Sequence, residues 1–291
     1  MAYPFRFGVN MIAPSSRTAW IERCRRAEQL GFDVIGVPDH LGLAAPFPAL
    51  MLAGEATERV RLNTFVLNTP FYNPVLLARD VAGLDQLTDG RVELGLGAGY
   101  VKAEFDAAGM SFPSARERVD HLERTVTTLR GLFADPEYTP RPVQPGGPTL
   151  LMAAWGDRSL RLAAAHADIV AFTGAGASDN GRLTLADSAA LAKRTDYVRD
   201  HLGGRTVEFN LLVQAVIGDQ ERSAAADSLA AHLPFEFDGD LGDLPVLLLG
   251  TPAQIADTLR ERRETLGFNY ITVLEPNMEK LAPVIELLRG E

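Results

Sequence analysis

Cysteine and long apolar runs are scarce in this sequence, and each scarcity excludes a class of protein. The single cysteine, Cys24, excludes an internal disulfide bond and favours a reducing compartment. No run of 18 apolar residues is present, so we expect no membrane-spanning helix. The first residues, MAYPFRFGVN, lack a basic segment followed by an apolar one, so we expect no signal peptide and a cytoplasmic protein.

Positive charge is also in deficit. The formal net charge is −10, and a surface of this sign repels nucleic acids and anionic membranes. We therefore expect neither of them as a partner, and a small molecule as the substrate. The 46% content of hydrophobic residues suits a globular protein with a large core, and a length of 291 residues suits one α/β barrel, so we expect a single domain over 1–291.

Several common catalytic motifs are missing. The five histidines form no HExxH or other close ligand pair, so we expect no metal site. The sequence has no GxSxG turn and no P-loop lysine, which leaves a serine hydrolase and a P-loop nucleotidase unsupported. The segment GLGAGY at 95–100 begins like a dinucleotide fingerprint, but its sixth position is Tyr100 and it follows the fourth strand, so a Rossmann site is not expected.

Short apolar runs alternate with longer amphipathic segments along nearly the whole chain. The apolar runs are almost continuous, which is typical of parallel strands that are covered on both faces. The pattern predicts a (β/α)8 TIM barrel with insertion loops at the carboxyl ends of the strands. A doubly wound open sheet is the alternative, but its early phosphate-binding glycine motif is absent. The eight expected strands are 5–11, 33–40, 60–68, 92–99, 149–155, 168–174, 207–218 and 269–276.

Capping residues mark several of the expected helices. Asn73 and Thr251 each precede a proline, and Ser114 and Thr251 each precede a glutamate or glutamine three residues later, so a helix is expected to begin at each of the three. Residues 234–249 fit no element clearly. The expected helices are 17–30, 47–58, 74–89, 114–133, one from 156, 184–202, 220–232, one from 251 and one that ends near 288, with loops at 135–148 and 174–182.

The carboxyl ends of the strands carry the active site in barrels of this kind. The second expected strand ends in Asp39-His40. A histidine at this position can exchange protons near neutral pH, and a neighbouring acid can orient its ring or hold its charge. The alternative is a structural role, in which His40 satisfies the backbone at the end of the strand.

Two more strand ends are candidate parts of a binding site. The glycines of 97–100 (GAGY) leave room for a flat ligand at the mouth of the barrel. The turn at 154–158 (AWGDR) opens a helix, whose free N–H groups bind phosphate well, and Arg158 could contribute to that binding. An ordinary capped helix, with Asp157 complementing the helix dipole, is the alternative for this turn.

Four segments taken together resemble the bacterial-luciferase-like superfamily, and within it the coenzyme F420-dependent oxidoreductases. They are LGFDVIGVPDH at 30–40, the stretch from VRLNTFVLN to EFDAAG at 60–109, GDRSLRLAAAHADIVAF at 156–172 and GTPAQIADTLRERRETLGFNYITV at 250–273. The likeness is strongest over 1–175. It implies a (β/α)8 barrel, the deazaflavin F420 as hydride carrier and a homodimer.

The resemblance also implies roles for particular residues. His40 matches the histidine that acts on substrate or cofactor during hydride transfer, and Tyr100 is a second catalytic candidate. The third strand of the family often carries a bulge with a non-proline cis peptide behind the cofactor ring. The residues expected to hold the cofactor are Asp39, Phe65, Val66, Asn68, Gly97, Ala98, Gly99, Ala154, Trp155, Gly156, Asp157 and Arg158, with the cis peptide at Phe65-Val66.

The sequence departs from the family at places that bear on activity. Tyr100 stands where a sugar-phosphate dehydrogenase of the family has a glutamate proton donor, and residues 175–248 match least, so the substrate is not indicated. The arginine that luciferases carry near Ala98 is absent, which disfavours FMN. An F420-dependent oxidoreductase is therefore the leading hypothesis. The alternatives are an FMN-dependent monooxygenase that uses O2 and a partner reductase, and a barrel that binds a ligand without catalysis.

Overall fold

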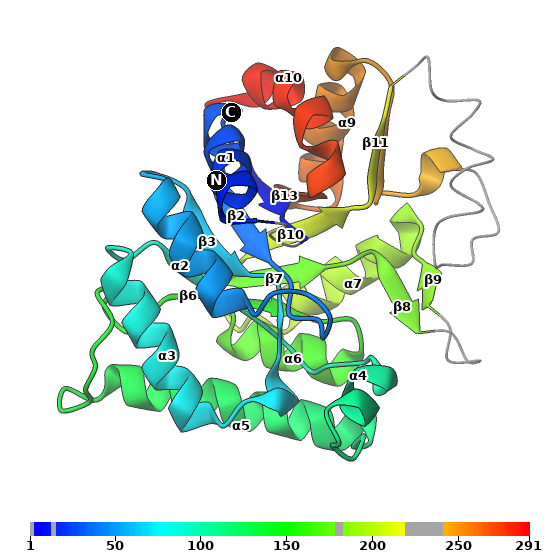
Figure 1. The fold of residues 1–291 in the computed structure, drawn as a ribbon. Helices are drawn as coiled ribbons and strands as arrows, with labels where there is room; N and C mark the ends of the chain where they lie inside the picture. The colour runs from blue at the N-terminus through cyan, green and yellow to red at the C-terminus, as the bar shows by residue number, and fades with distance from the viewer. Residues whose placement is uncertain (1–2, 13–15, 178–182, 219–240) are drawn as a thin grey trace.

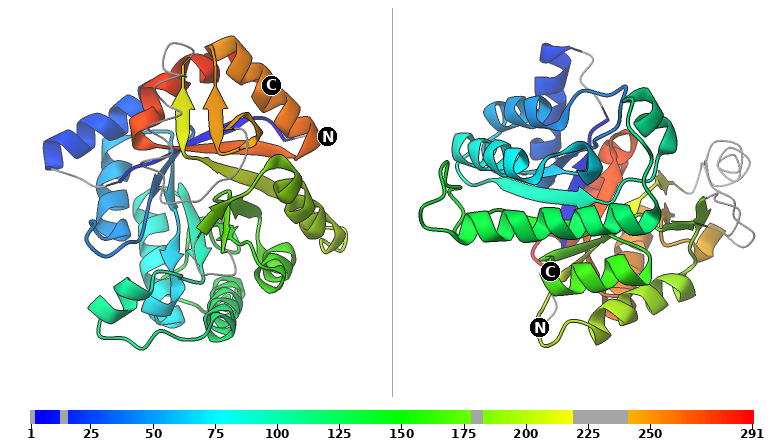
Figure 2. Two further views of the ribbon diagram at one scale, coloured as in Figure 1. Left: turned by 90° about the vertical axis from the view of Figure 1, so that its right-hand side faces the viewer. Right: turned by 90° about the horizontal axis from the view of Figure 1, so that it is seen from below.

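A closed ring of parallel strands forms the centre of the protein (Figures 1 and 2). The computed structural model describes residues 3–12, 16–177, 183–218 and 241–291. The ring closes because β3 (Arg61–Thr64) and β4 (Leu67–Asn68) both pair with β5 (Val92–Gly97). The predicted (β/α)8 barrel is confirmed. The other barrel strands are β1 (Arg6–Asn10), β2 (Val34–Val37), β6 (Thr149–Ala153), β7 (Ile169–Phe172), β10 (Glu208–Val213) and β13 (Phe268–Leu274).

Helices cover the outside of the barrel (Figure 1). The expected caps are present: Asn73 accepts hydrogen bonds from two backbone N–H groups, and Ser114 and Thr251 each form a capping box. No helix in the described ranges is long and apolar enough to cross a membrane. The helices are α1 (Arg17–Gln29), α2 (Pro46–Ala56), α3 (Pro74–Leu87), α4 (Lys102–Ala107), α5 (Ala115–Ala134), α6 (Asp157–His166), α7 (Ser188–Asp200), α9 (Pro252–Thr265) and α10 (Met278–Leu288), with short 3-10 turns η1 (Thr69–Phe71), η3 (Leu241–Asp243) and η4 (Glu275–Asn277).

Apolar side chains pack on both faces of the strands. The larger cluster lies between the strands and the helices and includes the fully buried Trp20, Phe172 and Phe268. Burial on both faces explains why the strands read as almost continuous apolar runs. A second cluster comes from the strands and the segment between β3 and β4, and it consists of Val34, Phe65, Leu151, Ile169, Ala171, Leu212 and Tyr270.

The third strand is interrupted at the bulge that the family resemblance implied. The expected strand 60–68 consists of β3 and β4, and Phe65-Val66 separates them. The peptide bond between these two residues is cis, as predicted. Phe65 is buried in the second apolar cluster, while Val66 is half-buried.

The seventh strand is also divided. The prediction of one strand over 207–218 is wrong, because the chain leaves the barrel after β10 and continues as β11 (Ala215–Ile217). This segment pairs in parallel with β12 (Leu247–Leu249), which lies in the stretch that the sequence left unassigned. Each paired residue is 32 positions away along the chain (247 − 215 = 32), so local pattern could not reveal the pairing. The helix expected at 220–232 lies outside the described residues.

A two-stranded hairpin replaces part of an expected loop. The loop predicted at 174–182 begins with β8 (Ala175–Ala177), which pairs antiparallel with β9 (Leu183–Leu185). The helix expected at 184–202 accordingly begins later, where Asp187 accepts a hydrogen bond from the backbone of the first turn. Both this hairpin and α4 lie toward the right of Figure 1, at the end of the barrel that carries the carboxyl ends of the strands.

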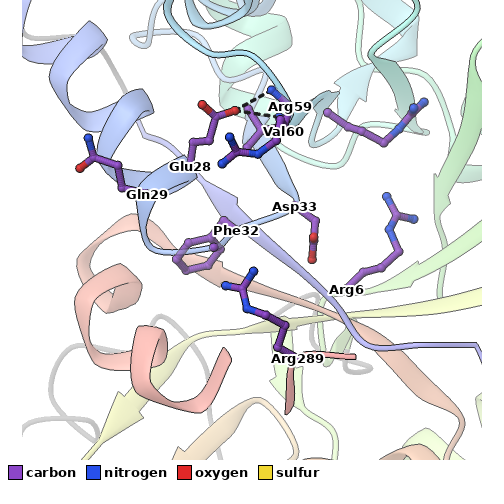
Figure 3. Close-up of a pocket in the computed structure, with 10 residues that line it drawn as sticks. Arg6, Glu28, Gln29, Phe32, Asp33, Arg59, Val60 and Arg289 are labelled. Carbon is purple, nitrogen blue, oxygen red and sulfur yellow. Dashed lines mark hydrogen bonds between the residues drawn. The ribbon is translucent and has the colours of Figure 1, made fainter. Parts of the chain in front are cut away.

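Paired charges occupy the opposite end, where the strands begin. Glu93 is only 1% exposed and accepts hydrogen bonds from Arg6 and, at 2.8 Å, from Arg61. Arg6 also contacts both carboxylate oxygens of Glu208 at 3.2 Å. A hollow of about 440 Å³ opens beside this network and lies far from the carboxyl ends of the strands. Its lining includes Arg6, Glu28, Gln29, Phe32, Asp33, Arg59, Val60 and Arg289 (Figure 3).

Candidate active site

Asp39 is held by two donors just beyond the end of β2. Its Oδ2 accepts hydrogen bonds from the backbone N–H of Asn68 at 2.9 Å and from the Tyr72 hydroxyl at 3.0 Å. Burial raises the pKa of Asp39, and the two donors act against this rise. Burial and the nearby Asp39 also raise the pKa of Tyr72, so its hydroxyl stays protonated and can donate. Asp39 thus ties the end of β2 to the end of β4.

His40 forms the second part of the site. Its Nδ1 lies 2.7 Å from Oε1 of Glu104, which belongs to α4 just after β5. The Glu104 side chain is 13% exposed, whereas that of His40 is 41% exposed. A shielded carboxylate therefore backs an imidazole that is open to solvent. This arrangement suits a residue that gives or takes a proton.

Tyr100 lies one helical turn before Glu104 in the chain, and it is 62% exposed. Partial shielding of the phenol and the charge of Glu104 raise the pKa of Tyr100. The phenol therefore stays protonated at neutral pH and can donate a hydrogen bond. Its exposure leaves the ring accessible to a ligand.

The glycines of β5 make room for the neighbouring bulge. A Cβ on Gly95 would lie 1.9 Å from the Thr64 carbonyl oxygen, and one on Gly97 would lie 2.8 Å from Cγ2 of Val66. Gly99 has a φ of 73°, and a Cβ there would lie 2.1 Å from Oδ1 of Asn68. The sequence suggested that these glycines leave space for a flat ligand. In the structure, the space beside these glycines is filled by Thr64, Val66 and Asn68 of the neighbouring strand segments, because β4 and β5 are neighbours in the sheet.

Two buried amide oxygens at the strand ends point to a ligand. Oδ1 of Asn10, at the end of β1, and Oδ1 of Asn68, at the end of β4, have no hydrogen-bond partner among the described residues. A buried acceptor without a partner costs free energy, and a bound group that donates to it removes that cost. A cofactor that carries N–H or O–H donors would satisfy these acceptors.

The turn at 154–158 opens α6, as predicted, but its charged residues are engaged elsewhere. The guanidinium of Arg158 contacts the carboxylates of Asp120 and Glu123 on α5. Asp157 accepts a hydrogen bond from Arg194 of α7 at 2.7 Å. To contribute to phosphate binding as expected, the Arg158 side chain would have to break its contacts with these two carboxylates. The half-buried Ala154 and Trp155 and the exposed Gly156 stay candidates for contact with the cofactor.

Sequence reasoning missed two residues of the site. Tyr72 reads as part of an ordinary turn, and Glu104 reads as one acid in a surface segment. The i, i+4 spacing of Tyr100 and Glu104 was the available signal, but α4 has only six residues and shows no apolar periodicity. Lys102 of the same helix bonds Asp106 at 2.6 Å and both side chains are exposed, so this lysine lies in a surface ion pair. Among the residues that the structure describes, no three His, Cys, Asp or Glu side chains gather to hold a metal ion.

Comparison with known proteins agrees with this geometry. The luciferase-like monooxygenase family matches residues 1–246. An F420-dependent glucose-6-phosphate dehydrogenase of Intrasporangium calvum is 30% identical, over 93% of this chain and 94% of the relative. An F420-dependent secondary alcohol dehydrogenase, solved with an F420-acetone adduct, has a TM-score of 0.77 at 18% identity, over 98% of each chain. The monooxygenase RslO1 of Streptomyces bottropensis has a TM-score of 0.72 at 24% identity, over 97% of each chain.

The two solved structures are similar in fold alone, whereas the family match and the first relative extend to the sequence. The family match covers the strand ends that carry Asp39, His40 and the bulge at Phe65-Val66. The chain therefore belongs to the luciferase-like monooxygenase family.

Proposed function

We propose that the protein is an F420-dependent oxidoreductase that moves a hydride between the deazaflavin and a small organic substrate. The observation that carries this proposal is the pair formed by His40 and Glu104 at the carboxyl end of the barrel, 2.7 Å apart. The F420-dependent relative, 30% identical over nearly the whole of both chains, supports the choice of cofactor. When bound, F420 accepts or supplies the hydride that the protein itself cannot carry.

Specific residues of this chain would hold the cofactor. Asp39 and Asn68 are tied together at the ends of β2 and β4, and Phe65-Val66 forms the bulge between them. The other residues that we propose to hold it are Gly97, Ala98 and Gly99 after β5, and Ala154, Trp155, Gly156, Asp157 and Arg158 after β6.

His40 would handle the proton that accompanies the hydride. With the bound cofactor as hydride acceptor, an alcohol substrate would give its hydroxyl proton to Nε2 of His40 and become a carbonyl compound. Reduction of a carbonyl compound runs through the same transfers in reverse. Tyr100, with its protonated phenol, would donate a hydrogen bond to the substrate oxygen. General acid–base help of this kind contributes about 10²–10⁴-fold to a rate.

Glucose 6-phosphate is not the substrate that we expect. The glutamate proton donor implied by the family resemblance is replaced by Tyr100. In addition, Lys102 is bonded to Asp106 in the structure and so is not poised for a phosphate group. Assaying glucose 6-phosphate beside uncharged alcohols and ketones tests this expectation, because rapid turnover of the sugar phosphate would contradict it.

The first experiment is a titration of the purified protein with F420 and, separately, with FMN, followed by ligand fluorescence. Tight F420 binding with weak FMN binding is the expected result. Preference for FMN would instead favour a monooxygenase, and O2 uptake with a partner reductase would then be measured. Binding of neither ligand would contradict the proposal. We also propose that the protein is cytoplasmic and forms a homodimer. Light scattering of the purified protein would test the dimer by measuring its mass in solution.

A further inference from the structure

The short helix α4 has a position that the proposed function leaves unexplained. It follows the glycine turn after β5, and its residue Glu104 reaches His40, just beyond the end of β2 and 64 residues earlier in the chain. α4 also contains Asp106, which pairs with Lys102 in an exposed salt bridge. One acid of this helix thus points to the site, while the other stays on the surface.

A carboxylate oxygen can only accept a hydrogen bond, so the 2.7 Å contact requires the proton on Nδ1 of His40. In a neutral imidazole the other nitrogen, Nε2, then carries a lone pair. No described residue bonds Nε2, and the ring is 41% exposed. The contact therefore selects one tautomer, whose accepting atom is unpartnered among the described residues.

Charge supports the same arrangement. When Nε2 takes a proton, the ring becomes a cation, and the 13% exposed Glu104 carboxylate lies within hydrogen-bond distance of it. Opposite charges attract more strongly when they are shielded from water. The carboxylate thus stabilises the protonated ring that forms as the substrate loses its proton.

We infer that Glu104 is a positioning residue, which fixes the Nδ1–H tautomer of His40 and stabilises its protonated form during proton transfer. The inference rests on the proposed function. Glu104 acts through His40 and is not assigned a contact with the substrate or the hydride carrier.

The test compares Glu104→Gln with Asp106→Asn, which removes an acid from the same helix at an exposed position. Glu104→Gln should lower kcat by roughly 10–10²-fold, less than removal of the histidine, and leave KM and the Kd for F420 within about threefold. Asp106→Asn should leave all three constants nearly unchanged. Thermal unfolding of both variants checks that each is folded.

A second measurement reads the tautomer directly and needs no turnover. In protein labelled with ¹⁵N-histidine, at mildly alkaline pH, the His40 signals should show the proton on Nδ1, with their assignment made by loss of the signals in His40→Gln. In Glu104→Gln the amide can also donate to Nδ1, so the Nε2–H form should gain population. Asp106→Asn should keep the wild-type pattern.

Each outcome decides the question. Unchanged kcat and an unchanged ¹⁵N pattern in Glu104→Gln would overturn the inference, as would a fall in kcat without a change of tautomer, because Glu104 would then act directly on the substrate. Loss of F420 binding in this variant alone would make Glu104 a cofactor ligand instead. If the wild type binds no F420, the proposed function fails, while the ¹⁵N comparison still decides whether Glu104 positions His40.

Discussion

The two ends of the barrel use charged side chains in opposite ways. At the amino end, Glu93 is buried and its Oε1 contacts both Arg6 and Arg61, so its charge is balanced within the protein (Figure 3 views the region beside it). At the carboxyl end, Glu104 is shielded but its partner His40 remains open to solvent. Charge at the first end holds strands together, whereas charge at the second is available to a ligand.

This difference follows from the direction of the strands. The strands at all eight positions of the barrel run in parallel. One end of the barrel therefore carries all the amino ends of the strands, and the other carries all the carboxyl ends. The carboxyl ends lead into loops that can vary, such as those that carry α4 and β8, without disturbing the pairing of strands. Changes at the amino end should therefore cost mainly stability, and changes at the carboxyl end mainly activity.

The largest effect is expected from His40→Ala. Loss of the acid–base group should lower kcat by about 10²–10⁴-fold while F420 binding stays nearly intact. Because the ring is 41% exposed, the free energy of unfolding should change little. Steady-state kinetics, F420 fluorescence and urea unfolding measure the three quantities. Unchanged turnover would remove His40 from the catalytic residues.

Glu93→Gln should give the opposite result. The substitution leaves Arg6 and Arg61 facing a neutral amide. Breaking a fully buried ion pair costs about 3–5 kcal/mol of unfolding free energy, and the partial exposure of both arginines places the expected cost at or below the lower end of this range. The folded fraction should keep its kcat. Glu208→Gln, at the more exposed end of the same network, is the control and should cost less. A loss of kcat in folded Glu93→Gln would break the division between the two ends.

Gly95→Ala tests a position in the middle of β5, where we expect a change to affect both stability and cofactor binding. The added methyl group would meet the Thr64 carbonyl oxygen at 1.9 Å, so the bulge must shift, and overpacking of this kind costs about 1–3 kcal/mol. We expect weaker F420 binding as well, because Phe65-Val66 belongs to the proposed cofactor site. Gly83→Ala is the matched control: a Cβ there meets nothing within 4 Å, and alanine should stabilise helix α3 by about 0.5–1 kcal/mol. Equal effects of the two changes would refute the close approach at Gly95.

The smallest effect concerns pH and Glu28, which borders the hollow at the amino end (Figure 3). Burial alone would raise the pKa of Glu28, but hydrogen bonds from the backbone of Arg59, Val60 and Glu58 outweigh it and lower the pKa. A lowered folded-state pKa stabilises the protein above the ordinary glutamate pKa, and this stabilisation is lost as pH falls through the folded value. Glu28→Gln should therefore cost roughly 1 kcal/mol at neutral pH and progressively less in acid. Urea unfolding across this range measures the difference, and a constant gap at all pH values would contradict the assignment.

The sequence by itself determined the alternation of barrel strands and helices and the place of Asp39-His40 at the end of a strand. Continuous apolar runs, three capped helices and the position of Asp39-His40 at a strand end are local features, and local pattern is enough to predict them. The structure confirms a barrel strand at each of the eight expected places, although the seventh ends early at Val213, and it confirms the caps and the cis peptide that the resemblance implied.

Only the tertiary structure decided which side chains meet. Glu104 reaches His40 across 64 residues, β11 pairs with β12 across 32, and Arg158 bonds acids of α5 that precede it by more than thirty positions. Each of these contacts depends on how the barrel closes, and closure brings together strand ends that are remote in the chain. A six-residue helix such as α4 has too few turns to show a period, so its role depends on the partner that the fold supplies.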